Sequence, residues 1–376
     1  MVGIRFEPVD TLFFRDGTPF TAASDAQEAV ASVFPPAAET LIGALRAALA
    51  RGRGWSGVGR WPDSFNPVLG DGPDDLGSLS FRGPVLVRGD EPLLPAPLHL
   101  RGRFDAAEDA WAPAALLRPG EPVCCDLGDQ ALLPAVPETC SDPATLKPAT
   151  GSWLTARGFQ AVLDGRLPTR EQLVPADDLW VEEPRIGLKR DPARRTAEQG
   201  MLYSTRHVRL GAGVGLGLWV GGLPEEWTLP FGRLLALGGE GRMAACEPWD
   251  GRLSFEPPWD AIERSRRFVL VAVTCLDVDA AVLVGQRPLP GLAQVRVVSA
   301  CSARPVRVGG WDSLRCEPRP LRSVWPAGSV LFCECDDPPS LRAAASEGWV
   351  QIGERRNWGY GWLAVGRWPD GLEANT

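Results

Sequence analysis

Hydrophobic and polar residues alternate at the start of the chain in the pattern of a half-buried strand. Val2, Ile4 and Phe6 are apolar, whereas the residues between them are small or polar. Further along, branched apolar residues recur at helical spacing and predict a helix over 39–51, which Gly52 follows. We therefore expect the chain to open as strand, loop and helix.

The last third of the chain repeats short apolar runs separated by polar turns. Their length and their content of β-branched residues are typical of strands. Between two of them, Asp337 and the prolines after it supply the cap and first turn of a helix that Gly348 ends. Many strands and few helices predict an α+β fold, with helices on one face of an antiparallel sheet. The expected strands span 268–276, 294–301, 329–335, 349–352 and 362–365.

Length and charge pattern indicate how the chain is divided. A chain of 376 residues fits two domains, which we place at 1–254 and 255–376. Pro, Gly and Asp are frequent from about 55 to 148, and long periodic segments are few there. Over 60–145, six arginines stand against fourteen acidic residues, a net charge of −8 that equals the formal charge of the whole chain. We interpret this stretch as an acidic insertion in the first domain.

A basic segment follows the acidic one. Over 185–209, seven basic residues outnumber two acidic residues, which gives a net charge of +5. Apolar residues flank a polar centre, and this pattern indicates two strands joined by a tip. We predict a long basic hairpin over about 183–210. A solvated arm that binds nothing would show the same pattern.

A second segment, 353–362, combines glycines with arginines and aromatic residues. Glycines let a backbone approach phosphate closely, and the guanidinium forks of Arg355 and Arg356 suit phosphate oxygens. Trp358 and Tyr360 offer faces on which unpaired bases stack. The alternative is a glycine-rich hairpin whose aromatic side chains belong to the core. Together with the basic hairpin, the segment points to single-stranded RNA or DNA held through its backbone.

Motifs and composition argue against several classes of enzyme. The chain has no phosphate-binding G-x-x-x-x-G-K-[ST] loop, and its glycine run over 211–217 leads into a strand and a turn rather than a helix. Nine cysteines without C-x-x-C spacing and only two histidines, His99 and His207, give little support to a metal site. We expect no catalytic residue, no metal and no cofactor.

Neither an export signal nor a membrane span is expected. The residues MVGIRFEPVDTLFF lack a basic lead followed by an apolar stretch. The longest apolar run, 268–276, is too short to cross a bilayer as a helix. We expect a cytoplasmic protein without membrane contact. The formal charge of −8 argues against coating nucleic acid by bulk charge, but it is compatible with a local basic groove.

Several motifs resemble those of one protein family. The opening FEPVDTLFFRDGTPF and the late GERRNWGYG are similar to motifs of the third subunit of type III-B CRISPR effector (Cmr) complexes, a member of the RAMP superfamily. The similar segments occur in the expected order from end to end, and only 55–150 shows little resemblance. They span 6–20, 34–36, 40–46, 183–187, 200–203, 309–311, 326–330 and 353–361.

This resemblance implies two ferredoxin-like (RRM-like) domains, with a long insertion and a protruding hairpin called the thumb. It implies a non-catalytic subunit of an antiviral ribonucleoprotein, which grips the 5′ repeat-derived tag of the CRISPR RNA and caps the backbone filament. The implied protein partners are other Cmr subunits, notably the large polymerase-like subunit and the first backbone subunit. The implied RNA-binding residues are Arg15, Arg46, Arg185, Lys189, Arg190, Arg194, Arg195, Tyr203, Arg206, His207, Gly353, Arg355, Arg356, Asn357, Trp358, Gly359, Tyr360 and Gly361.

Two other functions stay open at this point. A RAMP-type, metal-independent endoribonuclease that processes CRISPR precursor RNA would need an acid–base residue, and His207 is the candidate. A protein-only assembly adaptor would instead place the basic hairpin against an acidic neighbour. Arg46 also has an alternative role, as a structural arginine of the first helix.

Overall fold

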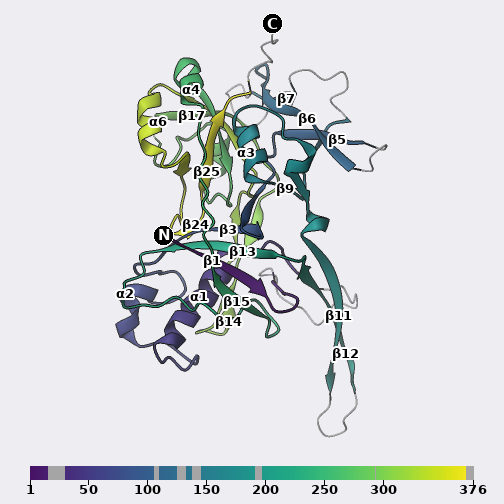
Figure 1. Ribbon diagram of the computed structural model, residues 1–376, viewed down its shortest axis with the longest axis vertical. Helices are drawn as coiled ribbons and strands as arrows, with labels where there is room; N and C mark the ends of the chain where they lie inside the picture. Colours follow the sequence, from purple (N-terminus) through teal and green to yellow (C-terminus); the bar gives the residue numbers. More distant parts are fainter. Residues whose placement is uncertain are drawn as a thin grey trace. The chain divides into compact units, whose positions relative to one another are not determined.

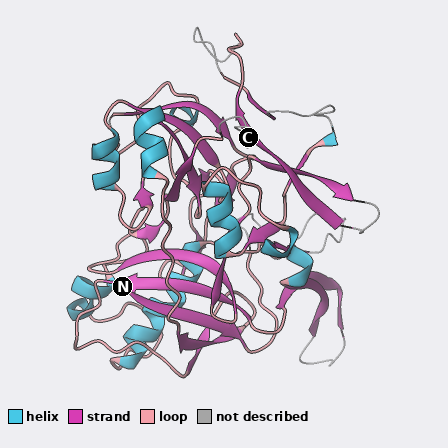
Figure 2. Cartoon of the chain, turned by 45° about the horizontal axis from the view of Figure 1, so that its top comes forward, coloured by secondary structure: helices cyan, strands magenta, loops and turns pink. Residues whose placement is uncertain are grey.

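The computed structural model describes residues 1–15, 30–105, 110–124, 133–137, 145–190, 197–292 and 294–369. Strands outnumber helices in the described chain, and most of the helices are short (Figure 2). No described helix has the length and apolar character needed to cross a bilayer. The chain forms two compact units, each assembled from separate stretches of sequence.

Unit 1 consists of Met1–Gly89, Asp177–Asp250 and Arg307–Arg322. Its central elements are β1 (Val2–Pro8), α1 (Ala38–Gly52), β3 (Ser80–Arg88), β13 (Val214–Gly221), β14 (Arg233–Ala236) and β15 (Met243–Pro248). The strands lie in the order β3-β13-β1-β15-β14, and each pairs antiparallel with its neighbours. The predicted opening strand and first helix are both confirmed.

The core of unit 1 explains why these two segments form a strand and a helix. Ile4 and Phe6 are fully buried on one face of β1, as the alternation of apolar and polar residues predicts. On α1, the helical spacing brings Leu41, Ile42 and Leu45 to one face, and all three are fully buried. The helix contacts β3 and β14. Two patterns of different period thus meet in one core.

Unit 2 consists of Asp90–Ala176, Gly251–Val306 and Ser323–Thr376. Its central elements are β16 (Arg267–Ala272), α5 (Ala280–Leu283), β17 (Val295–Cys301), β22 (Val330–Cys335), α6 (Pro338–Ala344), β23 (Trp349–Gln351) and β25 (Trp362–Arg367). The strands lie in the order β17-β22-β16-β25-β23 and are antiparallel throughout. The strands and the helix predicted for the last third of the chain are confirmed.

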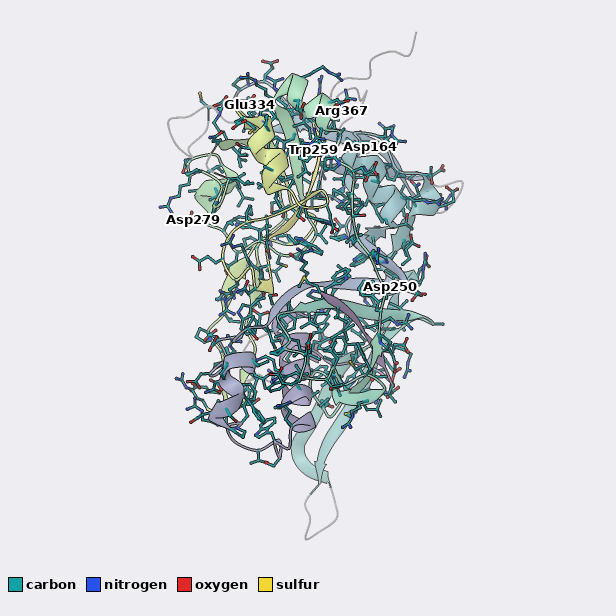
Figure 3. The ribbon with its side chains drawn as sticks, turned by 60° about the vertical axis from the view of Figure 1, so that its left-hand side comes forward. Asp164, Asp250, Trp259, Asp279, Glu334 and Arg367 are labelled. Atoms are coloured by element: carbon teal, nitrogen blue, oxygen red, sulfur yellow. The ribbon has the colours of Figure 1, made fainter. Side chains whose placement is uncertain are left out.

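Polar contacts at the surface of unit 2 join its elements. Helix α4 (Trp259–Ser265) contacts α6, and the guanidinium of Arg342 on α6 lies 5.7 Å from the centre of the Trp259 ring. Glu334 on β22 pairs with Arg267 of β16 at 3.4 Å and also with Arg296 of β17. One carboxylate therefore bridges three strands of the sheet; Figure 3 labels Trp259 and Glu334.

Residues 90–176 add two smaller sheets and one helix to unit 2. Their elements are β4 (Glu91–Pro95), β5 (Leu100–Asp105), β6 (Ala110–Pro119), β7 (Ala135–Pro137), β8 (Lys147–Pro148), β9 (Ser152–Leu154), α3 (Ala156–Leu163) and β10 (Leu173–Pro175). The sheets have the strand orders β10-β9-β4 and β7-β6-β5-β8. Helix α3 begins at Thr155, whose hydroxyl accepts a hydrogen bond from the amide of Gly158, and it contacts β4 and β25.

Shorter elements complete the described chain. They are β2 (Val30–Ala31), α2 (Asn66–Leu69), β18 (Val306–Val308), β19 (Trp311–Asp312), β20 (Glu317–Pro318), β21 (Arg322–Val324) and β24 (Trp358–Gly359), with 3-10 turns at Asp63–Phe65, Arg170–Gln172 and Ala176–Asp178.

The two units repeat one arrangement of strands. In unit 2, β16, α5, β17, β22, α6 and β25 follow one another in the chain, and the four strands lie in the order β17-β22-β16-β25. In unit 1, β1, α1, β3, β13 and β15 give the matching order β3-β13-β1-β15. A short strand, β23 or β14, extends each sheet at the same edge. The described residues between β13 and β14 contain no helix, so unit 1 lacks a counterpart of α6.

The structure corrects the predicted insertion and the predicted domain boundary. The stretch 55–148 supplies β3, a core strand of unit 1, and most of the rest belongs to unit 2. Phe81 and Val87 of β3 are buried, because β3 fills a position in the sheet beside β13. The two units do divide near Asp250, but unit 1 also takes Arg307–Arg322. Charge composition identified the acidic stretch but could not show where its strands pair.

His99 lies in the core of unit 2 and makes the stability of this unit depend on pH. Its side chain is fully buried beside Phe332, and within the described chain neither ring nitrogen has a hydrogen-bond partner. Burial, with a smaller effect of Arg101, lowers the pKa of His99 from 6.5 to about 3. Below pH 6.5, His99 therefore binds a proton in the unfolded chain but stays neutral in the folded chain. The free energy of unfolding falls as the pH drops.

We expect the free energy of unfolding of unit 2 to fall by about 2 kcal/mol between pH 7.5 and pH 5 because of this one residue. Urea unfolding at several pH values measures the effect. The His99→Phe variant keeps a ring of similar size and should lose that part of the pH dependence. Identical pH profiles for the two proteins would show that His99 does not cause it.

Candidate functional site

The predicted basic hairpin forms two long strands of unit 1, β11 (Trp180–Arg190) and β12 (Ala197–Leu210). They pair antiparallel from Trp180 opposite Leu210 to Leu188 opposite Leu202. In Figure 1 they extend as a ribbon away from α1 and from the sheet of their unit. Strand β12 also pairs in parallel with β2. The two predicted strands are confirmed, and 191–196 lie outside the described residues.

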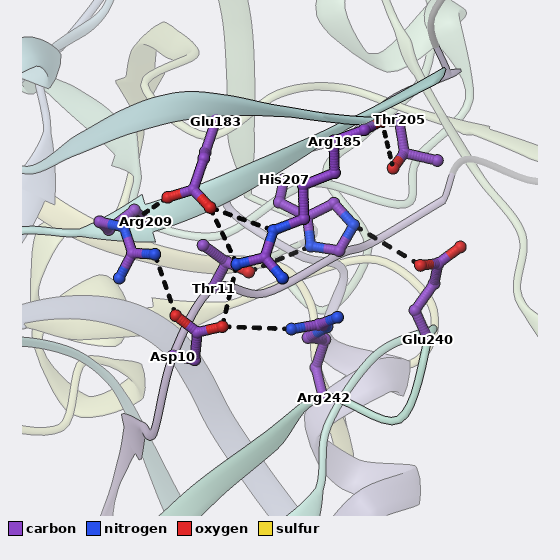
Figure 4. A network of polar contacts seen from close by, with 9 residues as sticks. All are labelled: Asp10, Thr11, Glu183, Arg185, Thr205, His207, Arg209, Glu240 and Arg242. Carbon is purple, nitrogen blue, oxygen red and sulfur yellow. Dashed lines mark hydrogen bonds and ion pairs between the residues drawn. The ribbon is translucent and has the colours of Figure 1, made fainter. Parts of the chain in front are cut away.

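At the base of the hairpin, two carboxylates hold three arginines (Figure 4). Asp10 accepts hydrogen bonds from Arg185 at 3.0 Å and from Arg209 at 2.9 Å, and a third from Arg242 at 3.2 Å. Glu183 accepts from Arg185 at 2.8 Å and from Arg209 at 2.6 Å. We call these five residues the base network. Hydrogen bonding holds the pKa of both carboxyls below the ordinary value, chiefly through Arg185 for Asp10 and through Arg209 for Glu183.

The basic residues of the hairpin fall into two groups. Three are described, and they pair with carboxylates: two in the base network, and Arg206 with Glu182 at 3.3 Å on the opposite face. Arg15, which also precedes a stretch outside the described residues, is exposed. The other implied contacts of the hairpin have side chains outside the described residues: Lys189, Arg190, Arg194, Arg195 and Tyr203.

His207 is not an exposed contact residue, and this prediction is corrected. Its side chain is fully buried on β12, where the ring stacks on Phe13 with 4.9 Å between centroids. Its Nδ1 lies 3.1 Å from the hydroxyl oxygen of Thr11. Desolvation by burial, reinforced by the charges of Arg242 and Arg185, lowers its pKa, so the ring is neutral at neutral pH. Arg206 beside it in the sequence is exposed, whereas His207 packs against Phe13 and Thr11.

Arg46 has the structural role that we considered as its alternative. Its side chain is buried on α1, and the guanidinium donates to the carbonyl oxygens of Gly72 at 2.9 Å, of Asp75 at 2.7 Å and of Leu69. Burial lowers its pKa to about 10, which leaves it charged at neutral pH. Its guanidinium is hydrogen-bonded to three carbonyl groups, so the implied RNA contact is corrected. Arg46 instead connects α1 with the segment that precedes β3.

The glycine-rich loop of unit 2 exposes fewer groups than the sequence predicts. Arg356 and Asn357 are exposed, and Arg355 is half-buried with its guanidinium 5.2 Å from the centre of the Trp358 ring. Trp358 and Tyr360 are only 6% and 3% exposed. The prediction that their rings offer stacking faces is therefore wrong, and the alternative, a hairpin with its aromatic side chains in the core, is what the structure shows.

The glycines of this loop are required by the backbone. Gly361 has φ +73°, and a Cβ there would lie 1.8 Å from the carbonyl oxygen of Ile352. Gly353 has φ +80°, and its Cβ would lie 2.6 Å from the carbonyl oxygen of Asp277. Gly359 has φ +85° and is buried. These glycines hold the fold of the loop, and its exposed polar side chains are those of Glu354, Arg356 and Asn357, with Arg355 half-buried.

Unit 1 contains a counterpart of this loop that sequence reasoning missed. The segment LGGEGR at 237–242 joins β14 to β15, as 352–361 joins β23 to β25. In each case, one amide donates to the segment that follows the first strand of the unit: Gly239 to Phe13 at 2.8 Å, and Glu354 to Asp277 at 3.0 Å. The three glycines that precede Arg242 are the sequence feature that could have identified this second glycine-rich loop.

Sequence reasoning also missed the partners in the base network. In the sequence, Asp10 is one residue of the opening motif with no indication of its partners. Arg242 lies 57 positions beyond Arg185 in the chain. Nothing local shows that these residues meet. Asp10 meets the hairpin because Leu12 pairs with Val208 through two backbone hydrogen bonds of 2.8 and 2.9 Å. It meets Arg242 because the neighbouring amide of Val9 donates to the carbonyl oxygen of Met243 at 3.0 Å.

Comparisons with solved structures define the class of this fold. The fold is similar to that of a chain in the cryo-EM structure of the type III-B Cmr-beta bound to cognate target RNA and AMPPnP, with a TM-score of 0.51 and 14% identity over 88% of this chain and 86% of that chain. A chain of the type III-B Cmr-beta bound to cognate target RNA gives the same values. A chain of the Csm3-Csm4 subcomplex of the type III-A interference complex gives a TM-score of 0.40 and 9% identity over 89% of this chain and 94% of that chain. The fold is therefore similar to that of a chain of the type III-B Cmr-beta structures.

The sequence then identifies the family. The profile of the CRISPR-associated Cas_Cmr3 proteins matches residues 4–368, so the chain belongs to the Cas_Cmr3 family. The resemblance noted in the opening and closing motifs is thereby confirmed. No curated protein matches the chain.

Proposed function

We propose that this chain is a non-catalytic, RNA-binding subunit of a type III-B CRISPR effector complex that grips the 5′ repeat-derived tag of the CRISPR RNA. The observation that carries the proposal is the hairpin of β11 and β12, a long ribbon whose 185–209 segment has a net charge of +5 in a chain of −8. Single-stranded RNA is held through such local positive charge, because counterions leave its phosphates on binding.

The topology of the two units supports this proposal. Each sheet has the strand order expected of a β-α-β-β-α-β ferredoxin-like fold, complete in unit 2 and without the second helix in the described part of unit 1. We interpret both as ferredoxin-like, RRM-like domains. In this architecture, the sheet and the hairpins at its edges form a platform for RNA. Membership of the Cas_Cmr3 family favours RNA of the CRISPR system as the ligand.

The protein partners of the proposal are the other subunits of the complex. The similar chain belongs to a Cmr assembly bound to target RNA. We propose that this chain caps the filament beside the large polymerase-like subunit and contacts the first backbone subunit. Co-purification with these subunits, crosslinking of RNA to this chain and sequencing of the crosslinked RNA test the function. We expect RNAs that begin with one common repeat-derived sequence. Crosslinks spread evenly along the guide would contradict the role at the tag.

Burial of His207 disfavours the endoribonuclease alternative. A general base must reach the ribose 2′-hydroxyl, and a ring with no exposed surface does not. Incubation of the protein with repeat RNA in the absence of metal discriminates the two functions. Specific cleavage that disappears in His207→Ala would establish the nuclease. An adaptor without RNA would be established if the assembled complex crosslinked its RNA only to other subunits.

The two arginines of the unit 2 loop provide a direct test of RNA contact. Reversing the charge in an Arg355→Glu/Arg356→Glu variant should weaken tag RNA binding by about 25-fold or more at 0.1 M salt, because two single-strand phosphate contacts contribute about −1.4 to the slope of log K against log salt. Fluorescence anisotropy over a salt series measures both the affinity and the slope.

A matched control exists in the same unit. Arg264 and Arg266 are exposed near the end of α4, and Arg266 has φ +56°, close to the +51° of Arg355. The Arg264→Glu/Arg266→Glu variant therefore carries the same charge change and similar backbone strain. Equal losses of affinity in both variants would assign the effect to net charge and remove the loop from the interface.

A further inference from the structure

The base network joins three separate elements of unit 1 at one carboxylate. Arg185 comes from β11, Arg209 from β12, and Arg242 from the end of the glycine-rich loop before β15. Oδ2 of Asp10 accepts from Arg185 and Arg242, and Oδ1 accepts from Arg209. Asp10 itself follows β1. Asp10 therefore contacts all three guanidinium groups, and Glu183 contacts two of them.

The base network keeps positive charge and hydrogen-bond donors toward solvent. Three guanidinium groups and two carboxylates leave one net positive charge. The side chains of Arg209, Arg185 and Arg242 are 45%, 33% and 20% exposed. In the part of the chain that the structure describes, neither Nη1 of Arg185 nor Nη1 of Arg209 has an acceptor. Guanidinium groups held in one orientation present the fork that binds phosphate oxygens in pairs.

Anchoring the hairpin does not require this network. Leu12 and Val208 exchange two backbone hydrogen bonds, and Leu12, Val208 and the stacked pair of Phe13 and His207 are all buried. Exposed ion pairs contribute little to folding. The carboxylates therefore matter more for the direction in which the arginines point than for stability.

We propose that Asp10 is a positioning residue for RNA: with Glu183, it orients Arg185, Arg209 and Arg242 as one cationic face that binds a backbone phosphate at the foot of the hairpin. This inference rests on the proposed RNA-binding function and deepens it, because it locates a phosphate contact in unit 1 and assigns it to a carboxylate. The ligand is a phosphodiester of single-stranded RNA.

The inference predicts an effect opposite to that of bulk charge. Asp10→Asn removes a negative charge beside the RNA, and a simple field effect would strengthen binding. If Asp10 orients the arginines, the variant loses one phosphate contact. Affinity for tag RNA should then fall about fivefold at 0.1 M salt, and the slope of log K against log salt should become shallower by about 0.7.

Two further variants make the result decisive. Asp178→Asn removes an exposed carboxylate two positions before β11, outside the base network, and should leave affinity unchanged or raise it. Arg209→Lys keeps the charge, but an ammonium group replaces a fork that bonds Asp10 and Glu183 together, so it should weaken binding as Asp10→Asn does. Thermal unfolding of each variant checks that all three are folded.

Weaker binding and a shallower slope in Asp10→Asn and Arg209→Lys, but not in Asp178→Asn, support the proposal. If Asp10→Asn binds as tightly as the unmodified protein or more tightly, while Lys189→Gln/Arg190→Gln binds more weakly, the positioning role is overturned and the proposed function stands. If the unmodified protein shows no salt-dependent binding of tag RNA, the proposed function and the positioning role fail together.

Discussion

Replacing Lys189, Arg190, Arg194 and Arg195 together with glutamine should weaken binding of the CRISPR RNA tag by about 10²- to 10³-fold at 0.1 M salt. Each phosphate that a cation neutralises on a single strand contributes about −0.7 to the slope of log K against log salt, so four contacts contribute about −2.8. These four residues hold most of the basic charge of the hairpin outside its base. Fluorescence anisotropy with labelled tag RNA between 0.05 and 0.5 M salt, a range of about one decade, measures both the affinity and the slope.

The control for this prediction must change the net charge by the same amount elsewhere. Arg264, Arg266, Arg304 and Arg307 are exposed and lie outside the hairpin and both glycine-rich loops. Their fourfold glutamine variant should retain most of the affinity, with a slope close to that of the unmodified protein. Equal losses in the two variants would mean that RNA responds to the overall field of the chain, and the hairpin would lose its special role.

Gly361→Ala should destabilise unit 2 by about 2–5 kcal/mol, because two costs act together. The new Cβ would lie 1.8 Å from the carbonyl oxygen of Ile352, and φ of +73° is unfavourable for alanine. The affected backbone closes the hairpin between β23 and β25, where Ile352 and Gly361 are hydrogen-bonded. Urea unfolding followed by tryptophan fluorescence measures the loss of stability.

Gly151→Ala separates the two costs. Gly151 also lies in unit 2 and has φ +72°, but a Cβ there would meet nothing within 4 Å. Its variant should lose only about 1 kcal/mol, the cost of the backbone conformation alone. If Gly361→Ala unfolded at the same urea concentration as Gly151→Ala yet failed to bind RNA, Gly361 would be a ligand contact rather than a structural glycine.

The sequence predicted elements well where the pattern is local. The strand from Val2, the helix of Leu41 and Ile42 and the strands of unit 2 follow from apolar residues at fixed spacing, because burial of one face selects strand or helix. The two hairpin strands were found in the same way. Prediction failed over 55–148, where β3 pairs with β13, a strand more than 120 positions further along the chain.

The candidate site shows the same division between local and distant information. A basic residue can be counted from the sequence, but its partner cannot. Arg46 and Arg356 are both arginines near glycines, yet one is buried among carbonyl groups and the other is exposed. Trp358 and Tyr360 belong to a motif that resembles a stacking platform, but both rings are buried.

By itself, the sequence determined the family, the α+β composition, the strands of the hairpin and the island of positive charge, because each depends on residues close together in the chain. Only the tertiary structure decided which of these residues face solvent. It buried His207 beneath the hairpin and brought Asp10 to three arginines from other elements. Exposure and ion pairing depend on contacts between distant segments, which no local pattern encodes.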